Sequence, residues 1–397
     1  MHLAPYRSVL RIPGMRLFML VALVARIPGT AAGTAMTLSV VLDRHRGYGA
    51  AGAVAAAFTV GLAIGSPLLG RTVDRRGPRP VLVLTGLCAA AFWTTAPLLP
   101  YSALLLVAVA GGALQVPVMG LVRQSLAARV PEEQRHQAYS LDSMSVEISF
   151  MVGPALAVLL ITQLGDGVST LRALGAALFV SAAVLWTYNP RVTTGDGAPE
   201  PAPPRSTWLG PQFLLVLGVG VAATTVLAGT DVSIVATLRA GGQIEWAGLT
   251  VIVWCAASLV GGFITGAMPK PLGMLTLMTL LGAATIPVGL AHAWPLLALA
   301  LIPAGLACAP TVAQTVVAVS RAVPESARGE AIGLHSAALT IGNAVGAPLA
   351  GSVIDHSSSA FGFAVVGAIG TTGAVGASGL LALRRIRRQP LPAPSEA

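Results

Sequence analysis

Long apolar runs without a charged residue recur along the whole chain. A helix needs about 20 such residues to cross a bilayer, and the uncharged runs of this sequence are 18 to 50 residues long. They cover residues 17–42 (interrupted only by Arg26), 47–70, 81–122, 148–165, 173–190, 206–230, 246–269, 271–320, 331–354 and 356–383. The runs over 81–122 and 271–320 are each long enough for two helices, so the pattern predicts twelve transmembrane helices.

Composition narrows the class further. Apolar residues make up 55% of the 397 residues, charged residues only 10%, and the mean hydropathy is +0.78. Soluble domains carry about 25% charged residues, so this chain has too few to cover a soluble surface. The composition therefore excludes a soluble enzyme, a nucleic-acid-binding protein and a disordered protein. Transmembrane barrels alternate polar and apolar positions, which these unbroken runs do not. We therefore expect an all-α membrane protein.

The basic residues indicate the orientation. The net charge is +9, and the arginines flank the apolar runs. With a cytoplasmic N-terminus, the inner segments hold 19 basic residues and the outer segments hold four. This asymmetry is typical of positive-inside topology. It accounts for the positive net charge, so we expect no nucleic-acid partner. We expect a multi-pass protein of the bacterial inner membrane with both termini in the cytoplasm, whose first apolar run is retained rather than cleaved as a signal peptide.

An internal repeat divides the chain into two halves. At a shift of 193 residues, positions 130–157 match positions 323–350 with 12 identities in 28, beginning with Val130-Pro131-Glu132 and Val323-Pro324-Glu325. The Pro-rich segment 189–210 follows the sixth predicted helix, and its composition predicts a linker. We therefore expect two six-helix bundles, residues 1–188 and 211–397, the second with a basic tail, joined by a cytoplasmic linker. Duplicated bundles suit alternating access to a central site.

A short loop carries a family resemblance. Residues 70–79 read Gly-Arg-Thr-Val-Asp-Arg-Arg-Gly-Pro-Arg, and this resembles the cytoplasmic signature of the major facilitator superfamily, Gly-x-Leu-x-Asp-Arg-x-Gly-Arg-Arg/Lys. The matching residues are Gly70, Asp74, Arg75, Gly77 and Arg79. The resemblance implies the major facilitator fold, with two pseudo-symmetric six-helix bundles. It also implies that Asp74 braces helix eleven when the cytoplasmic side is shut; the alternative is that the loop only anchors the chain. The corresponding second-half loop, 266–273, lacks the Asp.

Two further features bear on the direction of transport. Gly153 and Pro154 resemble the Gly-Pro element in helix five of proton-coupled drug exporters, although that element is richer in glycine. Many such exporters also carry an intramembrane Arg in helix four. In this chain, residues 107–110 occupy the position of that arginine, after the first turns of helix four. They are apolar, so we expect helix four to lack the arginine.

Three charges fall inside predicted helices, where an ionisable group is costly and therefore a candidate for function. Arg26 and Glu147 lie at similar depth, and we expect them to form an ion pair, either as part of proton coupling or as structural neutralisation. Asp231 has no evident partner: it either faces the cavity as a proton carrier or lies solvated at the outer surface. His335 is expected at the membrane interface.

Polar and flexible side chains in other helices are candidate substrate contacts. The resemblance implies that helices one, four, seven and ten line the cavity. The candidates are Gln115, Met119, Thr230, Gln314 and Asn343. Each polar one could instead form an interhelical hydrogen bond. The few polar groups favour a lipophilic or weakly polar solute over a sugar.

These observations favour a secondary transporter that exports small amphipathic molecules in exchange for protons. Uptake or facilitated exchange is the alternative within transport, and a receptor without flux is the alternative of another class. The sequence has no metal-ligand cluster, nucleotide loop or nucleophile motif, and its three cysteines show no ligand spacing. We therefore expect no enzyme activity, no cofactor and no metal, and a monomer whose partners are its solute, protons and the lipid bilayer.

Overall fold

The first half of the chain forms helices only. A computed structural model describes residues 4–46, 48–192 and 203–387. The elements of the first half are α1 (Ala4–Leu10), α2 (Met15–Leu42), α3 (Tyr48–Arg76), α4 (Pro78–Thr95), η1 (Ala96–Leu98), α5 (Tyr101–Ala113), α6 (Val118–Arg129), η2 (Glu132–Gln134), α7 (Arg135–Leu164) and α8 (Gly167–Tyr188).

The second half repeats this arrangement. Its elements are α9 (Arg205–Trp208), α10 (Pro211–Ala240), η3 (Ile244–Trp246), α11 (Ala247–Ala267), α12 (Met274–Thr285), η4 (Ile286–Leu290), α13 (Trp294–Ala322), η5 (Glu325–Ala327), α14 (Arg328–His356) and α15 (Ser359–Arg387). Part of the linker expected over 189–210, namely 193–202, lies outside the described residues, as does the end of the basic tail from 388.

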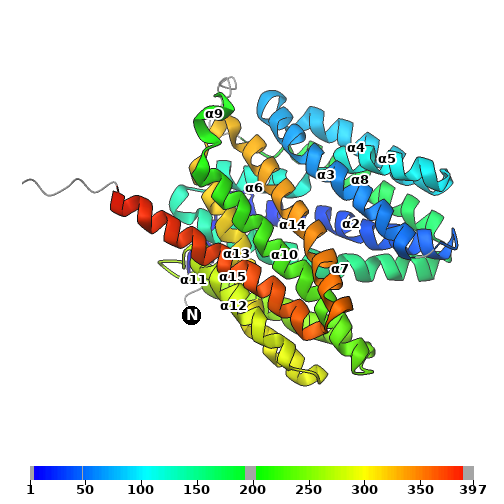
Figure 1. Cartoon of the computed structure of the whole chain (residues 1–397). Helices are drawn as coiled ribbons and strands as arrows, with labels where there is room; N and C mark the ends of the chain where they lie inside the picture. Colours follow the sequence, from blue (N-terminus) through cyan, green and yellow to red (C-terminus); the bar gives the residue numbers. More distant parts are fainter. Residues whose placement is uncertain (1–3, 47, 193–202, 388–397) are drawn as a thin grey trace, which may run out of the picture.

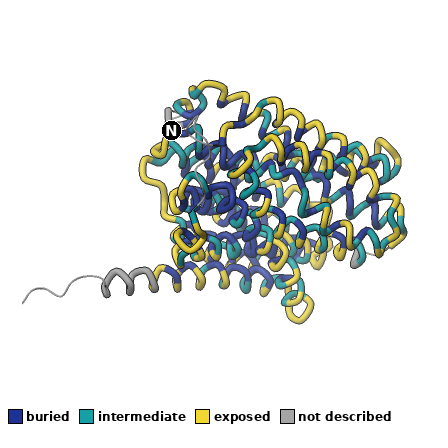
Figure 2. The backbone as a smooth tube through the Cα atoms, turned by 90° about the horizontal axis from the view of Figure 1, so that it is seen from above, coloured by how far each residue is buried: buried dark blue, intermediate teal, exposed yellow. Residues whose placement is uncertain are grey.

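The predicted fold class is confirmed. Eleven helices among the described residues are long and apolar enough to cross a membrane, and the shorter segment Met274–Leu290 supplies the twelfth span. Large apolar side chains are exposed on the outside, where they would contact lipid; Leu106 is 76% and Leu290 80% exposed. Figure 2 shows buried residues in the interior and exposed ones along the outer faces. This is the burial pattern of a bilayer-embedded bundle.

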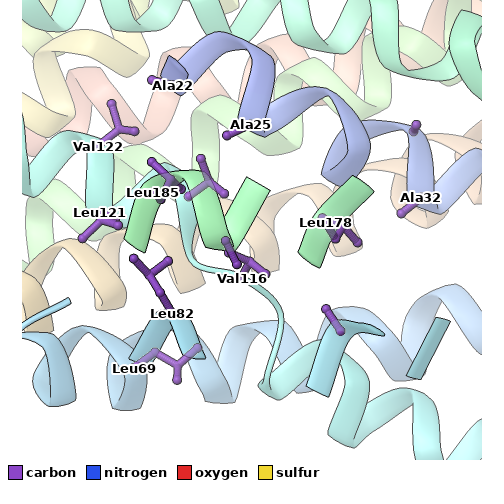
Figure 3. Close-up of a cluster of buried hydrophobic side chains, with 14 of the residues drawn as sticks. Ala22, Ala25, Ala32, Leu69, Leu82, Val116, Leu121, Val122, Leu178 and Leu185 are labelled. Atoms are coloured by element: carbon purple, nitrogen blue, oxygen red, sulfur yellow. The ribbon is translucent and has the colours of Figure 1, made fainter. Parts of the chain in front are cut away.

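The core of the first half is built from small and branched side chains on several helices. Figure 3 shows Ala22, Leu69, Leu82, Val122 and Leu185, from α2, α3, α4, α6 and α8, gathered in one cluster. The second half has three separate clusters, each with residues of α10 and α13, and α14 contributes to one of them. The two halves lie side by side in Figure 1 and spread apart away from α6 and α9. We call the end that carries α6 and α9 the linker end, and the opposite end the far end.

The charged ends of several helices are longer than the uncharged runs suggested. α7 begins at Arg135, so Asp142 and Glu147 lie within the helix, and α6 extends to Arg129. Arg123 therefore belongs to the fourth span, where its side chain is 4% exposed. Residues 107–110, where the arginine of many exporters was expected to be absent, belong to α5 and are apolar. The buried Arg123 lies near the other end of the span, and its burial was not predicted; a charge near a helix end can be buried between helices when it is paired.

The fourth span is interrupted. α5 ends at Ala113 and α6 begins at Val118, with Gln115 in the unwound turn between them. Pro117 has no backbone N–H and cannot continue the helical hydrogen-bond ladder. Gln115 was expected in mid-helix; the structure places it instead at this break, beside α2.

Gly153 permits close contact between α2 and α7. A Cβ atom there would lie 2.8 Å from Thr30 Cβ and 2.9 Å from Ala31 N, and Thr30 Oγ1 donates to the Ser149 carbonyl at 2.7 Å. The helix-five element predicted from Gly153 and Pro154 thus lies at a helix crossing. At the corresponding place in the second half, Thr225 Oγ1 donates to the Gly342 carbonyl at 3.2 Å.

Substituting Gly153 by alanine is expected to destabilise the protein by about 1–3 kcal/mol, the usual cost of overpacking. The apparent melting temperature of the purified protein in detergent measures this. Gly351→Ala is the matched control, because a Cβ at Gly351 meets no atom within 4 Å. Equal melting temperatures for the two variants would contradict the crossing as the reason for the glycine.

Candidate functional site

Two arginines share one carboxylate inside the first half. Arg26 on α2 forms an ion pair with Asp142 on α7, and its Nη1 donates to Ser145 Oγ at 3.2 Å. Arg123 on α6 contacts the other oxygen of Asp142 through Nε at 3.3 Å. All three charged side chains are buried. The cluster Arg26–Asp142–Arg123 ties three helices together and carries one net positive charge.

This cluster corrects the expected partner of Arg26. An Arg26–Glu147 pair was predicted, but the partner is Asp142, five residues earlier on α7. Asp142 was not considered as a partner, because it lies outside the uncharged run 148–165 that marked the helix. A signal was present in the sequence: Asp142, Ser145 and Ser149 recur at three- and four-residue spacing, which places them on one face of a helix.

Glu147 instead reaches the second half. It is the thirteenth residue of α7, about 18 Å along the helix axis. Its Oε1 accepts a hydrogen bond from Ser258 Oγ on α11 at 2.9 Å and one from Cys308 Sγ on α13 at 3.7 Å. Ser258 Oγ in turn accepts from the Ala309 N–H at 3.1 Å. Two polar donors from the opposite half therefore hold this carboxylate.

Asp231 on α10 lies near Glu147. The two carboxylates are close enough to interact electrostatically, and both act on Cys255 of α11. The Asp231 residue is exposed, whereas its neighbour Thr230 is fully buried. Within the described part of the chain, neither Glu147 nor Asp231 forms an ion pair. We call Glu147 and Asp231 the carboxylate pair; it combines one group from each half.

The two halves meet at the linker end along two contacts. The first seam joins α3 and α6 to α14. Asp74 accepts hydrogen bonds from the Gly329 and Glu330 N–H groups, each at 2.8 Å, and from Gln124 Nε2 at 2.6 Å. The carboxylate thus lies at the N-terminus of α14, where unpaired amides and the helix dipole favour a negative charge. This is the contact that the loop resemblance implied.

Glu330 extends the first seam. Its buried carboxylate pairs with Arg71 of α3 at 3.7 Å and receives a hydrogen bond from Arg205 Nε of α9 at 2.6 Å. Other residues of the matched loop have separate contacts: Gly77 has φ +76°, which disfavours a side chain, and Arg79 lies over the Trp186 ring at 5.1 Å. Arg75 is exposed.

The second seam joins α7 and α1 to α11 and α13. His136 Nε2 lies 2.7 Å from the Thr265 carbonyl oxygen, and His136 Nδ1 lies 2.7 Å from Gln314 Nε2. Tyr6 of α1 donates to the Phe263 carbonyl at 2.5 Å and the Gly262 carbonyl at 3.2 Å, and its ring stacks on Phe263. Neither His136 nor Tyr6 was singled out in the sequence, because single polar residues near a helix end carry no spacing signal.

The predicted substrate-contact residues are not gathered in one place. Gln314 contacts His136 in the second seam, and Thr230 is fully buried. Gln115 is 9% exposed, with a buried Oε1 that has no partner among the described residues. Met119 is half-buried and Asn343 is exposed.

His335 is not interfacial as expected. It is fully buried, and its Nε2 lies 2.8 Å from Thr315 Oγ1. Among the described residues there is also no group of three or more His, Cys, Asp or Glu side chains that could hold a metal ion.

Comparisons with known proteins agree with this architecture. The sequence profile described as Major Facilitator Superfamily matches residues 18–268 and 221–397. The search of curated proteins found no match.

Several solved structures with a similar fold align with nearly the whole chain. A bacterial homologue of the iron transporter ferroportin in an outward-facing state aligns with a TM-score of 0.73 at 14% identity, covering 94% of this chain and 99% of its own. The human organic anion transporter MFSD10 aligns at 0.66 and 16% identity, covering 94% and 99%. The proton:xylose symporter XylE, bound to a bromodeoxyglucose, aligns at 0.66 and 16%, covering 92% and 95%. At these identities the likeness concerns the fold.

Proposed function

Because this chain belongs to the Major Facilitator Superfamily, a family of transporters, we propose that it is a secondary active transporter that exports small amphipathic molecules in exchange for protons. The observation that carries this proposal is the carboxylate pair. Glu147 and Asp231 come from opposite halves, Glu147 acts electrostatically on Asp231, and neither forms an ion pair among the described residues. Groups of this kind can bind and release a proton as their surroundings change.

The arrangement of the halves supports alternating access. The two seams bring the halves together at the linker end, and the contacts along α7 extend from His136 to Glu147. Away from the linker end the halves spread apart (Figure 1). Asp231 is exposed, and Glu147 is close enough to act on it electrostatically. In this proposal, a proton or solute that arrives from the far end reaches Asp231 before the seams.

Charge assigns a compartment to each end. The linker end carries the loop 70–79, α9 and the start of α14, and 19 of the 24 basic residues lie in the segments that the charge pattern assigns to this side. Positive-inside topology then places the linker end and both termini in the cytoplasm of a bacterial inner membrane. We accordingly assign this conformation as closed to the cytoplasm and open to the outside, with residues 1–188 and 211–397 as the two moving bundles.

The exposed residues between the halves favour an amphipathic solute. Gly33 on α2 is exposed, and a Cβ there would meet nothing within 4 Å. The exposed Asn343 and the half-buried Met119 would add one polar and one flexible contact, and Gln115 is buried at the break in the fourth span. The solutes named for the similar structures include an organic anion, a sugar and iron, so the shared fold supports transport without selecting the solute.

A solute screen in everted membrane vesicles tests the function. Accumulation of an amphipathic solute that requires this protein and an imposed pH gradient, acidic inside the vesicle, is the expected result. Accumulation without the gradient would favour facilitated exchange. Binding of a solute to purified protein without flux in proteoliposomes would favour a receptor and overturn the proposal.

Asp74→Asn is expected to slow turnover several-fold while leaving substrate affinity nearly unchanged. The amide retains one acceptor oxygen but loses the charge that holds two amides of α14. Transport rate and equilibrium substrate binding, measured on the same preparation, separate the two effects. Asp355→Asn, an exposed carboxylate near the end of α14, is the control. Wild-type turnover in Asp74→Asn would contradict a gating role.

A further inference from the structure

The two seams occupy equivalent places in the repeat. A shift of 193 residues relates His136 to Gly329 and Ser140 to Gly333, near the starts of α7 and α14. On the opposing helices, Gly70 of α3 corresponds to Gly266 of α11. The contacts agree with this relation: a Cβ at Gly333 would lie 2.7 Å from Pro67 of α3, and one at Gly266 would lie 2.7 Å from Ser140 of α7.

The chemistry of the two seams differs at these equivalent places. In the first seam, Asp74 accepts hydrogen bonds from the Gly329 and Glu330 amides. The second half has Lys270 at the position that corresponds to Asp74, so no carboxylate can make the same contact with α7. An imidazole takes its place: His136, the counterpart of Gly329, contacts Thr265 of α11 and Gln314 of α13.

The contacts of His136 fit a neutral ring. A backbone carbonyl can only accept, so Nε2 carries the proton toward Thr265. In the neutral ring Nδ1 is then an acceptor, and it accepts a hydrogen bond from the Gln314 amide N–H. A second proton on Nδ1 would face this N–H group and would leave a positive charge buried in the seam. Rotation of the amide would restore a hydrogen bond but would not neutralise the buried charge.

We propose that His136 is a proton-responsive latch, which replaces in the second seam the carboxylate contact that holds the first. The neutral ring holds α7 against α11 and α13 and keeps the linker end closed. Proton uptake by His136 accompanies separation of this seam and exposes the ring to water. Acidification at the linker end therefore shifts the protein toward opening at that end. This inference rests on the alternating access of the proposed function.

The groups around His136 suit this role. Arg321 of α13 acts electrostatically on the ring and pairs with Glu132 at 3.5 Å. Arg135 turns away, donating to carbonyls of the α6 end. Burial raises the pKa of Tyr6 to about 12, so its hydroxyl stays protonated between pH 5 and pH 8 and its hydrogen bonds do not depend on pH there. α11 carries no Asp, Glu, Lys, Arg or His residue. The remaining charged groups on adjoining elements are Arg7, Arg123, Arg129, Glu133 and Lys270.

Spin labels across the second seam test the latch without any transported solute. Cysteines replace the exposed residues Glu133 and Lys270 in a background in which Cys88, Cys255 and Cys308 are alanine. Pulsed distance measurements between pH 8 and pH 5 should show a long-distance population that grows on acidification. By linkage, the open-to-closed ratio can rise by up to about tenfold for each unit by which the proton affinity of His136 differs between the two states.

Two variants assign the effect to this residue. His136→Gln keeps an amide that can donate to the Thr265 carbonyl but does not titrate, so its distances should not depend on pH. Gln314→Glu places a carboxylate opposite Nδ1, so acidification should close the seam rather than open it. His356→Gln, at an exposed histidine near the far end, should behave as wild type.

The outcomes are distinct from those of the proposed function. A wild-type distance distribution that is unchanged with pH, or a response of His136→Gln equal to that of wild type, would overturn the latch. Either result would leave the solute flux measurement unaffected. Conversely, a protein that moves no solute but shows the pH-dependent seam would retain the latch and lose the transport proposal.

Discussion

Glu147→Gln is expected to reduce transport driven by a pH gradient to the level of empty proteoliposomes, with the protein still folded. The glutamine side chain has nearly the same size and can still accept from Ser258 Oγ, so the contact with α11 persists. It cannot take up a proton. If Glu147 carries the exchanged proton, coupling is lost while the helix contacts remain.

Three comparisons sharpen this test. Asp231→Asn should give the same loss, because the two carboxylates interact. Glu147→Asp, which shortens the side chain but keeps the carboxyl group, should retain measurable pH-driven flux. Glu245→Gln removes an exposed carboxylate in η3 and should transport as wild type. Full flux in both Glu147→Gln and Asp231→Asn would reject the carboxylate pair as the proton carrier.

Asp142→Asn is expected to cause the largest loss of stability, about 3–5 kcal/mol. The substitution removes the one carboxylate that two buried arginines contact, Arg26 and Arg123. Both guanidinium groups would then remain in the interior without a counter-charge. Three helices, α2, α6 and α7, would lose their common contact.

The apparent melting temperature and the fraction of monodisperse protein in detergent measure this loss. Arg26→Gln should be milder, because it leaves the Arg123–Asp142 pair, which has no net charge. Glu132→Gln should cost less than about 1 kcal/mol, because its pair with Arg321 is exposed. A loss in Asp142→Asn no larger than that in Glu132→Gln would contradict the structural role of the cluster.

The sequence predicted the features that depend on short stretches of chain. Hydropathy and length are local properties, and they predicted the twelve spans, including the two pairs within the runs 81–122 and 271–320. The repeat at 193 residues predicted two similar halves. The loop around Asp74 predicted a contact at the start of the eleventh span, which in the structure is α14.

The partners of the buried charges could not be predicted in the same way. Glu147 was assigned to Arg26 because the two lie at similar depth in neighbouring helices, whereas helix rotation directs it toward Ser258 of the other half. Asp142 and Arg123 lie outside the uncharged runs, so neither was predicted within a helix, and pairing allows both to be buried there. Gln314 was a candidate either for a substrate contact or for an interhelical hydrogen bond, and the structure shows the second, with His136 of α7.

Taken by itself, the amino-acid sequence determined the membrane class, the number of spans and the division into halves, because each depends on how many consecutive residues lipid can accept. The tertiary structure alone decided which charge meets which, how the fourth span breaks beside α2, and which chemistry holds each seam. These depend on the rotation and packing of helices far apart in the chain, and a shift of one residue along a helix turns a side chain by 100°, enough to give it a different neighbour.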